Sequence, residues 1–406
     1  MFDVHGIRRQ FPLLSRADAP VYLDTAATAQ KPQCVLDAMN NFYQQEYGNA
    51  RRGMHPLAES ASVALEKART AVQHFVRARH AEEIIFTKSA TESLNMIALS
   101  LGKSWGRGDV IALSTLEHHS NIVPWQMLAA ERGVQIVWIP CNEEGHVDLA
   151  AFDAILEKGN VRLVNITAQS NVLGVRPPLE EIISRAHNVS ALICVDAAQA
   201  IAHEKIDVQE LGCDLLAFSG HKLYGPTGIG VLYGKRELLE KMPPVFGGGG
   251  MVQEVTPEGF MPDELPMKFE SGTPAVAEAV GLAAAIGWME SIGWKDVETH
   301  EHALIMHAAK KLDGIDGLKR LGPMSEKELH GCVSFVIEGV HPHDLTEILG
   351  KKGFCLRAGH HCAAPLHQHL NIPASTRLSV GIYNTAEEID ACVSAIGEAV
   401  HFLRGS

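Results

Sequence analysis

The sequence lacks the features that mark secreted, disulfide-stabilised and nucleic-acid-binding proteins. Its eight cysteines include no Cys-x-x-Cys pair, so we expect neither a disulfide framework nor a zinc knuckle. It has no Lys- and Arg-rich block, and 48 acidic against 35 basic residues give a formal net charge of −13. Because nucleic acid and anionic lipid both attract basic surfaces, neither is expected as a partner.

Long hydrophobic runs are missing as well. The first 20 residues carry charges at Asp3 and Arg8 and contain no apolar core, which argues against a secretory signal. The longest weakly polar stretch, 275–289, contains Glu278 and is too short to span a bilayer. We therefore expect a cytoplasmic protein whose cysteines are free thiols.

The composition is that of an ordinary globular protein. Hydrophobic residues make up 46% and charged residues 20% of 406 residues, which suits two or three domains. From residue 80 onward, apolar runs of strand length alternate with helix-like stretches. The expected strands are 83–88, 110–114, 135–139, 162–167, 191–196, 215–219 and 230–233. Nearly continuous apolar strands separated by helices predict an α/β fold with a mostly parallel, seven-stranded sheet buried on both faces.

The order of elements changes in the last third of the chain. Two long helical patterns, 276–291 and 295–312, precede a mixture of strands and helices. The expected strands there are 332–337, 354–358 and 377–381, and the expected helices are 342–352 and 386–402. We predict a large domain over 21–285 and a smaller α+β domain over 286–406, with residues 1–20 packing on the smaller one.

Polar groups follow several of the expected strands. These are Glu117-His118-His119, Ser170-Asn171, Asp196 with Gln199, and Ser219-Gly220-His221-Lys222. A capping box at Ser89–Glu92 opens a helix after another strand, and such an N-terminus binds anions. Because ligands collect at the carboxyl ends of strands in open α/β sheets, we expect one cleft with an anion site, a carboxylate, a lysine and an imidazole.

Each of these residues alone has an ordinary explanation. Asp196 could cap a helix, Lys222 could be a surface lysine, and His118 could be a core histidine. The combination suits pyridoxal 5′-phosphate, which needs a lysine for covalent attachment, an acid at its ring nitrogen and donors for its phosphate.

Cys362 is a candidate nucleophile. It lies in the short polar segment 358–365, and two histidines precede it. Neighbouring cationic groups stabilise a reactive thiolate, although a purely structural cysteine is the alternative. A metal site is not predicted, because three adjacent residues such as His360, His361 and Cys362 cannot all point at one ion without help.

Seven motifs occur in order along the chain. They are TESLN (91–95), EHHSNIVPW (117–125), SNVLG (170–174), VDAAQ (195–199), SGHKLYGPTGIG (219–230), ESGTP (270–274) and RAGHHCA (357–363). Together they resemble the SufS/CsdA-like (group II) cysteine desulfurases, pyridoxal-phosphate-dependent enzymes of class V and fold type I. The resemblance runs from YLDTAA (22–27) to YNT (383–385).

The resemblance implies a role for each matching residue. Lys222 would carry the cofactor, with Asp196 at its ring nitrogen, Gln199 at its phenolic oxygen and His118 over its face. The phosphate would be held by the amide of Ala90, by Thr91, Ser219 and His221, and by Thr273 of the other subunit of a homodimer. The substrate carboxylate would bind Arg377 and Asn171, with Arg357 lining the pocket beside the nucleophile Cys362.

The implied reaction converts L-cysteine to L-alanine and leaves a persulfide on Cys362. That sulfur would pass to a SufE/CsdE- or SufU-like acceptor protein for iron–sulfur cluster assembly. Selenocysteine lyase or cysteine sulfinate desulfinase is the alternative on the same fold, and a non-catalytic cofactor-binding subunit is an alternative of another class. The chain departs from the family pattern at Ala90, Ala168, Ala197 and Arg51-Arg52, which leaves the choice between the SufS and CsdA branches open.

Overall fold

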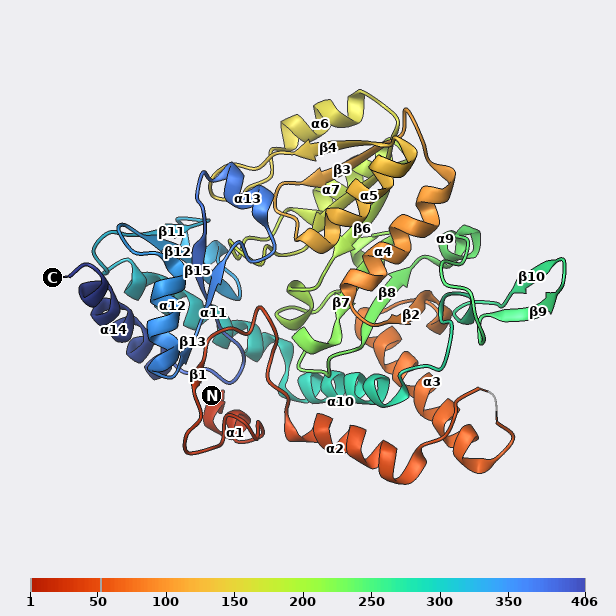
Figure 1. The fold of residues 1–406 in the computed structure, drawn as a ribbon, viewed down its shortest axis with the longest axis horizontal. Coiled ribbons are helices and arrows are strands. Elements are labelled where there is room, and N and C mark those ends of the chain that lie inside the picture. Colours follow the sequence, from red (N-terminus) through yellow and green to blue (C-terminus); the bar gives the residue numbers. More distant parts are fainter. Residues whose placement is uncertain (1, 52, 406) are drawn as a thin grey trace.

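The large domain is built on a seven-stranded sheet (Figure 1). The computed structural model describes residues 2–51 and 53–405, so Arg52 lies outside the described residues. Across the sheet the order is β2 (Ile84–Thr87), β8 (Gly230–Gly234), β7 (Leu215–Ser219), β6 (Leu192–Asp196), β5 (Val161–Thr167), β3 (Val110–Ser114) and β4 (Gln135–Ile139). All strand pairs are parallel except those made by β8, which confirms the predicted α/β fold.

Helices cover both faces of this sheet. Alternate residues of β7 show why: Leu215 and Ala217 join one apolar core, while Leu216 and Phe218 join the other. The first core is closed by α4 (Ala90–Leu101) and α5 (Val123–Arg132). The second is closed by α3 (Pro56–Val76), α6 (Leu149–Glu157), α7 (Leu179–Asn188) and α10 (Val276–Ile292). Because both faces are buried, the strands are apolar at nearly every position.

The smaller domain has its own antiparallel sheet and its own core. The strand order is β11 (Leu318–Leu321), β12 (Cys332–Ile337), β15 (Ser375–Ser379) and β14 (Arg357–Gly359). The helices that close this core are α11 (Trp294–Leu312), α12 (Pro342–Lys351) and α14 (Ala386–Leu403), whereas Leu366 of α13 (Ala364–His369) joins a core of the large domain. The strand expected at 354–358 is wrong as a single element. It is two strands with different partners, since β13 (Phe354–Cys355) pairs with β1 (Val21–Tyr22) and β14 pairs with β15.

The border between the two domains differs from the expected one at two places along the chain. The boundary expected after residue 285 falls inside α10, which continues to Ile292 before the chain turns by 83° into α11. We therefore propose Gly293 as the junction. Through its pairing with β13, β1 joins the smaller domain, although residue 21 was expected to begin the large one. Phe11 packs on Tyr224, Trp288 and Tyr383, so the N-terminal segment contacts both domains.

Among the described residues, no single helix combines the length and apolar composition needed to cross a membrane. Helices α10 and α11 meet that test by length and composition only as a bent pair.

Other short helices are α1 (Val4–Arg8), α8 (Val208–Leu211) and α9 (Arg236–Lys241), and α2 (Gln33–Asn41) packs beside α10.

A hairpin of β9 (Val252–Thr256) and β10 (Gly259–Pro262) projects from the large domain (Figure 1). The hairpin exposes Val255, Phe260 and Met261. Such apolar side chains outside a core mark a surface suited to a protein partner.

Candidate active site

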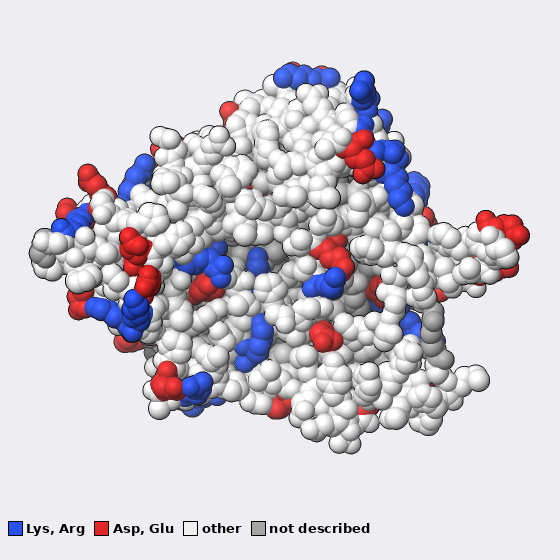
Figure 2. Space-filling view, in the orientation of Figure 1, with Lys and Arg blue, Asp and Glu red and all other residues white. Residues whose placement is uncertain are grey.

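A cavity of about 300 Å³ opens at the carboxyl ends of the sheet strands, where the two domains meet. Figure 2 shows the hollow on this face, with Lys and Arg side chains beside it. The residues predicted from sequence that line it are Ala90, Thr91, His118, Asn171, Asp196, Gln199, Ser219, His221, Lys222, Arg357, Cys362 and Arg377. Thr273 is the one predicted residue that lies elsewhere, exposed beside Gly250 and Gly272.

Lys222 and Asp196 face the cavity from neighbouring strands. Asp196 ends β6 and Lys222 follows β7, and the two strands pair directly. Burial, with a further contribution from Arg377, lowers the pKa of Lys222 to about 8, although Asp196 opposes that shift. Burial also raises the pKa of Asp196. The charge of Lys222 and the hydrogen bond that Asp196 accepts from the Ala198 N–H both oppose this rise. The pair supplies a nucleophilic amine beside a carboxyl group.

His118 has a defined proton position. Its Nδ1 accepts the backbone N–H of Ser120 at 3.1 Å, so the neutral ring carries its proton on Nε2. Burial, followed by the charge of Lys222, lowers the pKa of His118 to about 3. The imidazole is therefore neutral near pH 7 and presents an N–H donor. The Ser120 hydroxyl also links this ring to Thr91, at 2.9 Å and 2.7 Å.

Glu117 anchors the turn that carries His118. Its buried carboxyl group accepts from Asn121 Nδ2 at 2.6 Å and from the backbone N–H of Thr167 at 2.9 Å. Burial raises the pKa of Glu117 to about 8. Sequence reasoning assigned no role to Glu117 or Ser120, although both lie in a motif that it singled out.

The start of α4, where the sequence predicts an anion site, lines the cavity. Ser89 caps the helix by accepting the N–H of Glu92, and the Ser219 hydroxyl accepts the N–H of Ala90 at 2.8 Å. A side chain at Gly230 would place its Cβ 2.5 Å from the Ser89 backbone, so only glycine lets β8 pass beneath this helix end. The hydroxyls of Thr91 and Ser219 and the ring of His221 line the same part of the cavity. These donors suit a phosphate group.

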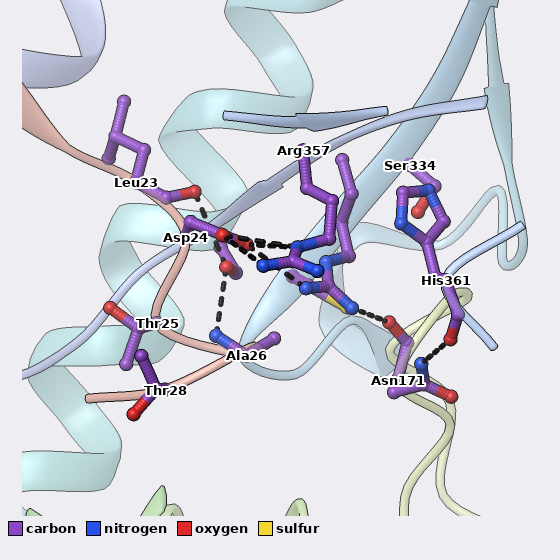
Figure 3. Close-up of polar contacts among 12 residues, drawn as sticks. Leu23, Asp24, Thr25, Ala26, Thr28, Asn171, Ser334, Arg357 and His361 are labelled. Carbon is purple, nitrogen blue, oxygen red and sulfur yellow. Dashed lines mark hydrogen bonds and ion pairs between the residues drawn. The ribbon is translucent and has the colours of Figure 1, made fainter. Parts of the chain in front are cut away.

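Two arginines from strands of the smaller domain, Arg357 on β14 and Arg377 on β15, line the cavity. Figure 3 shows Arg357 with Asp24 and Asn171. Arg377 on β15 is almost fully buried; its Nη1 donates to the Asn171 carbonyl at 2.8 Å and its Nη2 to Asp24 at 3.2 Å. Its Nε is buried and has no hydrogen-bond partner among the residues that the structure describes. Arg357 also binds Asp24, with contacts of 3.0 to 3.2 Å. This arrangement can take up a carboxylate.

The segment carrying Cys362 is short and held at three points. The Cys362 carbonyl accepts from the His119 N–H at 2.7 Å, the His361 carbonyl accepts from Asn171 Nδ2 at 2.7 Å, and His119 Nε2 accepts from the Ala364 N–H at 3.0 Å. His361 and Cys362 both adopt left-handed backbone, with φ of 51° and 56°. These bonds maintain the strained turn and leave the Cys362 side chain exposed in the cleft.

Comparisons with known proteins agree with this geometry. The model of the family "Aminotransferase class-V" matches residues 21–392. A probable cysteine desulfurase of Streptomyces coelicolor is 43% identical over 99% of this chain and 98% of its own length. The cysteine desulfurase of Pectobacterium atrosepticum is 40% identical over the whole of both chains.

Two solved structures extend the comparison. The apo cysteine desulfurase of Thermococcus onnurineus NA1 superposes with a TM-score of 0.93 at 37% identity, covering 99% of this chain and 98% of that one. The cysteine desulfurase CsdA of Escherichia coli gives a TM-score of 0.91 at 38% identity, covering 99% of both chains. The chain therefore belongs to the class-V aminotransferase family. Within that family it belongs with the cysteine desulfurases, as the sequence motifs predicted.

Proposed function

We propose that this enzyme converts L-cysteine to L-alanine and retains the sulfur as a persulfide on Cys362. The observation that carries the proposal is that one cleft holds the Lys222–Asp196 pair, the neutral His118, the buried Arg377 and the exposed thiol of Cys362.

The residues present fit pyridoxal 5′-phosphate. Lys222 would hold it covalently, Asp196 would face its ring nitrogen and His118 would lie over its ring, while the start of α4 with Thr91, Ser219 and His221 would hold its phosphate. The amide of Gln199 donates one hydrogen to the Ala26 carbonyl at 2.8 Å and has a second hydrogen for the phenolic oxygen. When bound, this cofactor supplies an electron sink for charge at the substrate Cα.

Each side chain in the cleft then has its own role in the proposed reaction. Arg377 and Asn171 bind the substrate carboxylate and orient the Cα proton toward Lys222, whose lowered pKa makes it a usable base. His118 Nε2 holds a proton for exchange with the substrate. The Cys362 thiolate attacks the substrate sulfur, so that a sulfur–sulfur bond forms as the carbon–sulfur bond of cysteine breaks. Arg357 and Lys222 both interact electrostatically with Cys362.

We further propose that the persulfide passes to a SufE/CsdE- or SufU-like acceptor protein in the cytoplasm. The exposure of Cys362 supports such transfer. A product assay with cysteine, a thiol reductant and candidate acceptors tests this function. Alanine should form steadily and an acceptor should raise the rate. A protein that binds the cofactor but releases no alanine would show the non-catalytic alternative to be right.

We expect the folded unit to be a homodimer in which Thr273 completes the phosphate site of the other subunit. Thr273 is exposed and lies outside its own cleft, and exposed apolar residues such as Tyr47, Met54 and Phe260 are available for an interface. Sedimentation should report a dimer. Thr273→Ala should weaken cofactor retention about tenfold, because a hydrogen bond to a charged group is lost. A fully active monomer in dilute solution would contradict this assembly.

A further inference from the structure

His119 is a residue to which the sequence motifs assign no role. Its backbone N–H donates to the Cys362 carbonyl at 2.7 Å, and Nε2 of its ring accepts the backbone N–H of Ala364 at 3.0 Å. These two bonds fix the chain immediately after the Cys362 side chain. Asn171 fixes it immediately before, through the His361 carbonyl (Figure 3). The thiol therefore lies between two anchors, and His119 provides one of them with both its backbone and its ring.

The ring of His119 acts as a neutral acceptor. A backbone N–H can only donate, so Nε2 carries a lone pair and the ring proton lies on Nδ1. Burial, followed by the interaction with His360, lowers the pKa of His119, which keeps the ring neutral near pH 7. His118 beside it has the opposite proton position, because its Nδ1 accepts from the Ser120 N–H. The two adjacent rings therefore have separate roles: one presents a donor, and the other accepts from the segment that carries the thiol.

The His119 ring replaces a missing cap at the start of α13. The N-cap residue is Ala363, which has no side-chain oxygen to accept from the first amides of the helix. His119 supplies an acceptor from another element to Ala364, the first residue of α13. Ala363 and Leu366 are fully buried in a core of the large domain, so the helix stays in place without this bond. Loss of the bond should therefore displace the turn before α13 rather than α13 itself.

A firmly held turn thus supports a strained one. Glu117 and Asn121 are fully buried, and the Glu117 carboxyl group accepts from Asn121 Nδ2 at 2.6 Å across the single 3₁₀ turn that contains His119. His361 and Cys362, in contrast, have left-handed backbone, which such residues keep only where surrounding contacts hold them. Sulfur transfer needs the two sulfur atoms within about 3 to 3.5 Å, and a displacement of about 1 Å can lower the rate about 100-fold. The position of the Cys362 turn should therefore control the rate of this step.

We propose that His119 is a positioning residue for sulfur transfer: by holding the Cys362 turn against the turn that carries His118, it places the thiol where it can reach the substrate sulfur. The inference rests on the proposed function, because it takes Cys362 as the nucleophile. His119 acts only through Cys362, without contact to substrate or cofactor.

Two variants of the complete enzyme test the role of the ring acceptor. His119→Phe keeps an aromatic ring but removes the acceptor, whereas the amide oxygen of His119→Gln can reach the position of Nε2. In His119→Phe, kcat for alanine release from cysteine should fall about 10- to 100-fold, because the thiol is displaced. In His119→Gln it should stay within about threefold of the wild-type value, because a neutral acceptor is retained. Cysteine binding, followed by the spectral change, should be unaltered in both, since Arg377 and Asn171 are intact.

Either variant can overturn the proposal. A His119→Phe enzyme with the wild-type kcat on cysteine would show that the bond to Ala364 does not position the thiol. A His119→Gln enzyme as slow as His119→Phe would assign the effect to packing of the ring and would also contradict the proposal.

Cysteine sulfinate separates positioning from general damage to the site. Its elimination does not require the Cys362 thiol in principle, so displacement of the thiol should leave that rate unchanged. The ratio of kcat on cysteine to kcat on cysteine sulfinate should therefore fall about 10- to 100-fold in His119→Phe. An equal loss on both substrates would show that His119 has only a structural role.

Amide hydrogen exchange gives a readout that does not depend on turnover. In His119→Phe the segment containing the Ala364 amide should exchange about two- to tenfold faster, the effect of one hydrogen bond. His119→Gln should exchange at the wild-type rate. His360→Gln is the matched control, because it changes an exposed imidazole of the same segment whose ring contacts His367, and it should leave this exchange unaltered. Unchanged exchange in His119→Phe would contradict the proposal.

The two hypotheses can fail separately. If the wild-type enzyme releases no alanine from cysteine, the proposed function is wrong, and the role of His119 in sulfur transfer is wrong with it. If the wild-type enzyme releases alanine and His119→Phe matches it on cysteine, only the proposal for His119 is wrong. Should His119→Phe not fold, His119→Ala removes the same acceptor without adding bulk and must show the same losses. A His119→Ala enzyme with wild-type turnover of cysteine would overturn the proposal.

Discussion

Cys362→Ala should reduce alanine release from cysteine by at least about 10³-fold, the scale of loss when a catalytic nucleophile is removed. Lys222, Asp196, His118 and Arg377 are unaltered, so the variant should still bind its cofactor and cysteine, and the spectral change on adding cysteine should persist. Because Cys362 is exposed and alanine keeps the same Cβ, the free energy of unfolding should change by less than about 0.5 kcal/mol. Steady-state kinetics, absorption spectra and thermal unfolding measure the three quantities.

Serine is the matched control at this position. Cys362→Ser keeps the size of the side chain, but a hydroxyl is a far weaker nucleophile than a thiol near neutral pH, so activity should not return. Selenocysteine and cysteine sulfinate serve as comparison substrates, since neither elimination requires this thiol in principle. If Cys362→Ala releases alanine from cysteine at the wild-type rate, Cys362 is structural and the lyase alternative takes the place of the desulfurase.

Lys222→Ala should abolish covalent cofactor attachment and lower kcat by about 10³-fold, within the usual range for removal of a general base. The wild-type protein should show a visible absorption band that borohydride removes, with the reduced label on the Lys222 peptide. Lys31 is a useful comparison, because burial also lowers its pKa to about 8 while its Nζ is held by the carbonyls of Ala29 and His221. The Lys31 peptide should remain unlabelled.

The pH dependence of cofactor attachment follows from the same amine. Burial lowers the pKa of Lys222 to about 8, and only the unprotonated amine is nucleophilic. Attachment of added pyridoxal 5′-phosphate to the cofactor-free protein should therefore become faster as the pH rises through about 8 and then level off. A Lys222→Ala protein that still bound the cofactor covalently and turned over would contradict the assignment.

Much of this fold could be predicted because its signals are local. Buried strands such as β7 and β6 are apolar at successive positions, and the capping residue Ser89 indicates the start of α4. The strand-end residues Asp196 and Lys222 follow directly from those strands. The domain boundary predicted from sequence fell inside α10. This helix is apolar throughout, so its sequence does not show against which domain core a given turn packs.

Asp24 shows why part of the site could not be predicted from local pattern. Its partners Arg357 and Arg377 lie 333 and 353 positions away in the chain, and only the pairing of the N-terminal segment with the smaller domain brings them together. Glu117 is similar: its carboxyl group bonds to the backbone of Thr167 on a neighbouring strand, a contact that depends on the register of β3 and β5.

The most direct test of the central claim is the mass of the Cys362 peptide after the enzyme has reacted with cysteine without reductant. We expect an added mass of one sulfur on this peptide, which a reductant or an acceptor thiol should remove. Burial raises the pKa of Cys332 to about 11 and also raises that of Cys355, which disfavours a thiolate at either residue. An added sulfur on Cys332 or Cys355, with none on Cys362, would contradict the account.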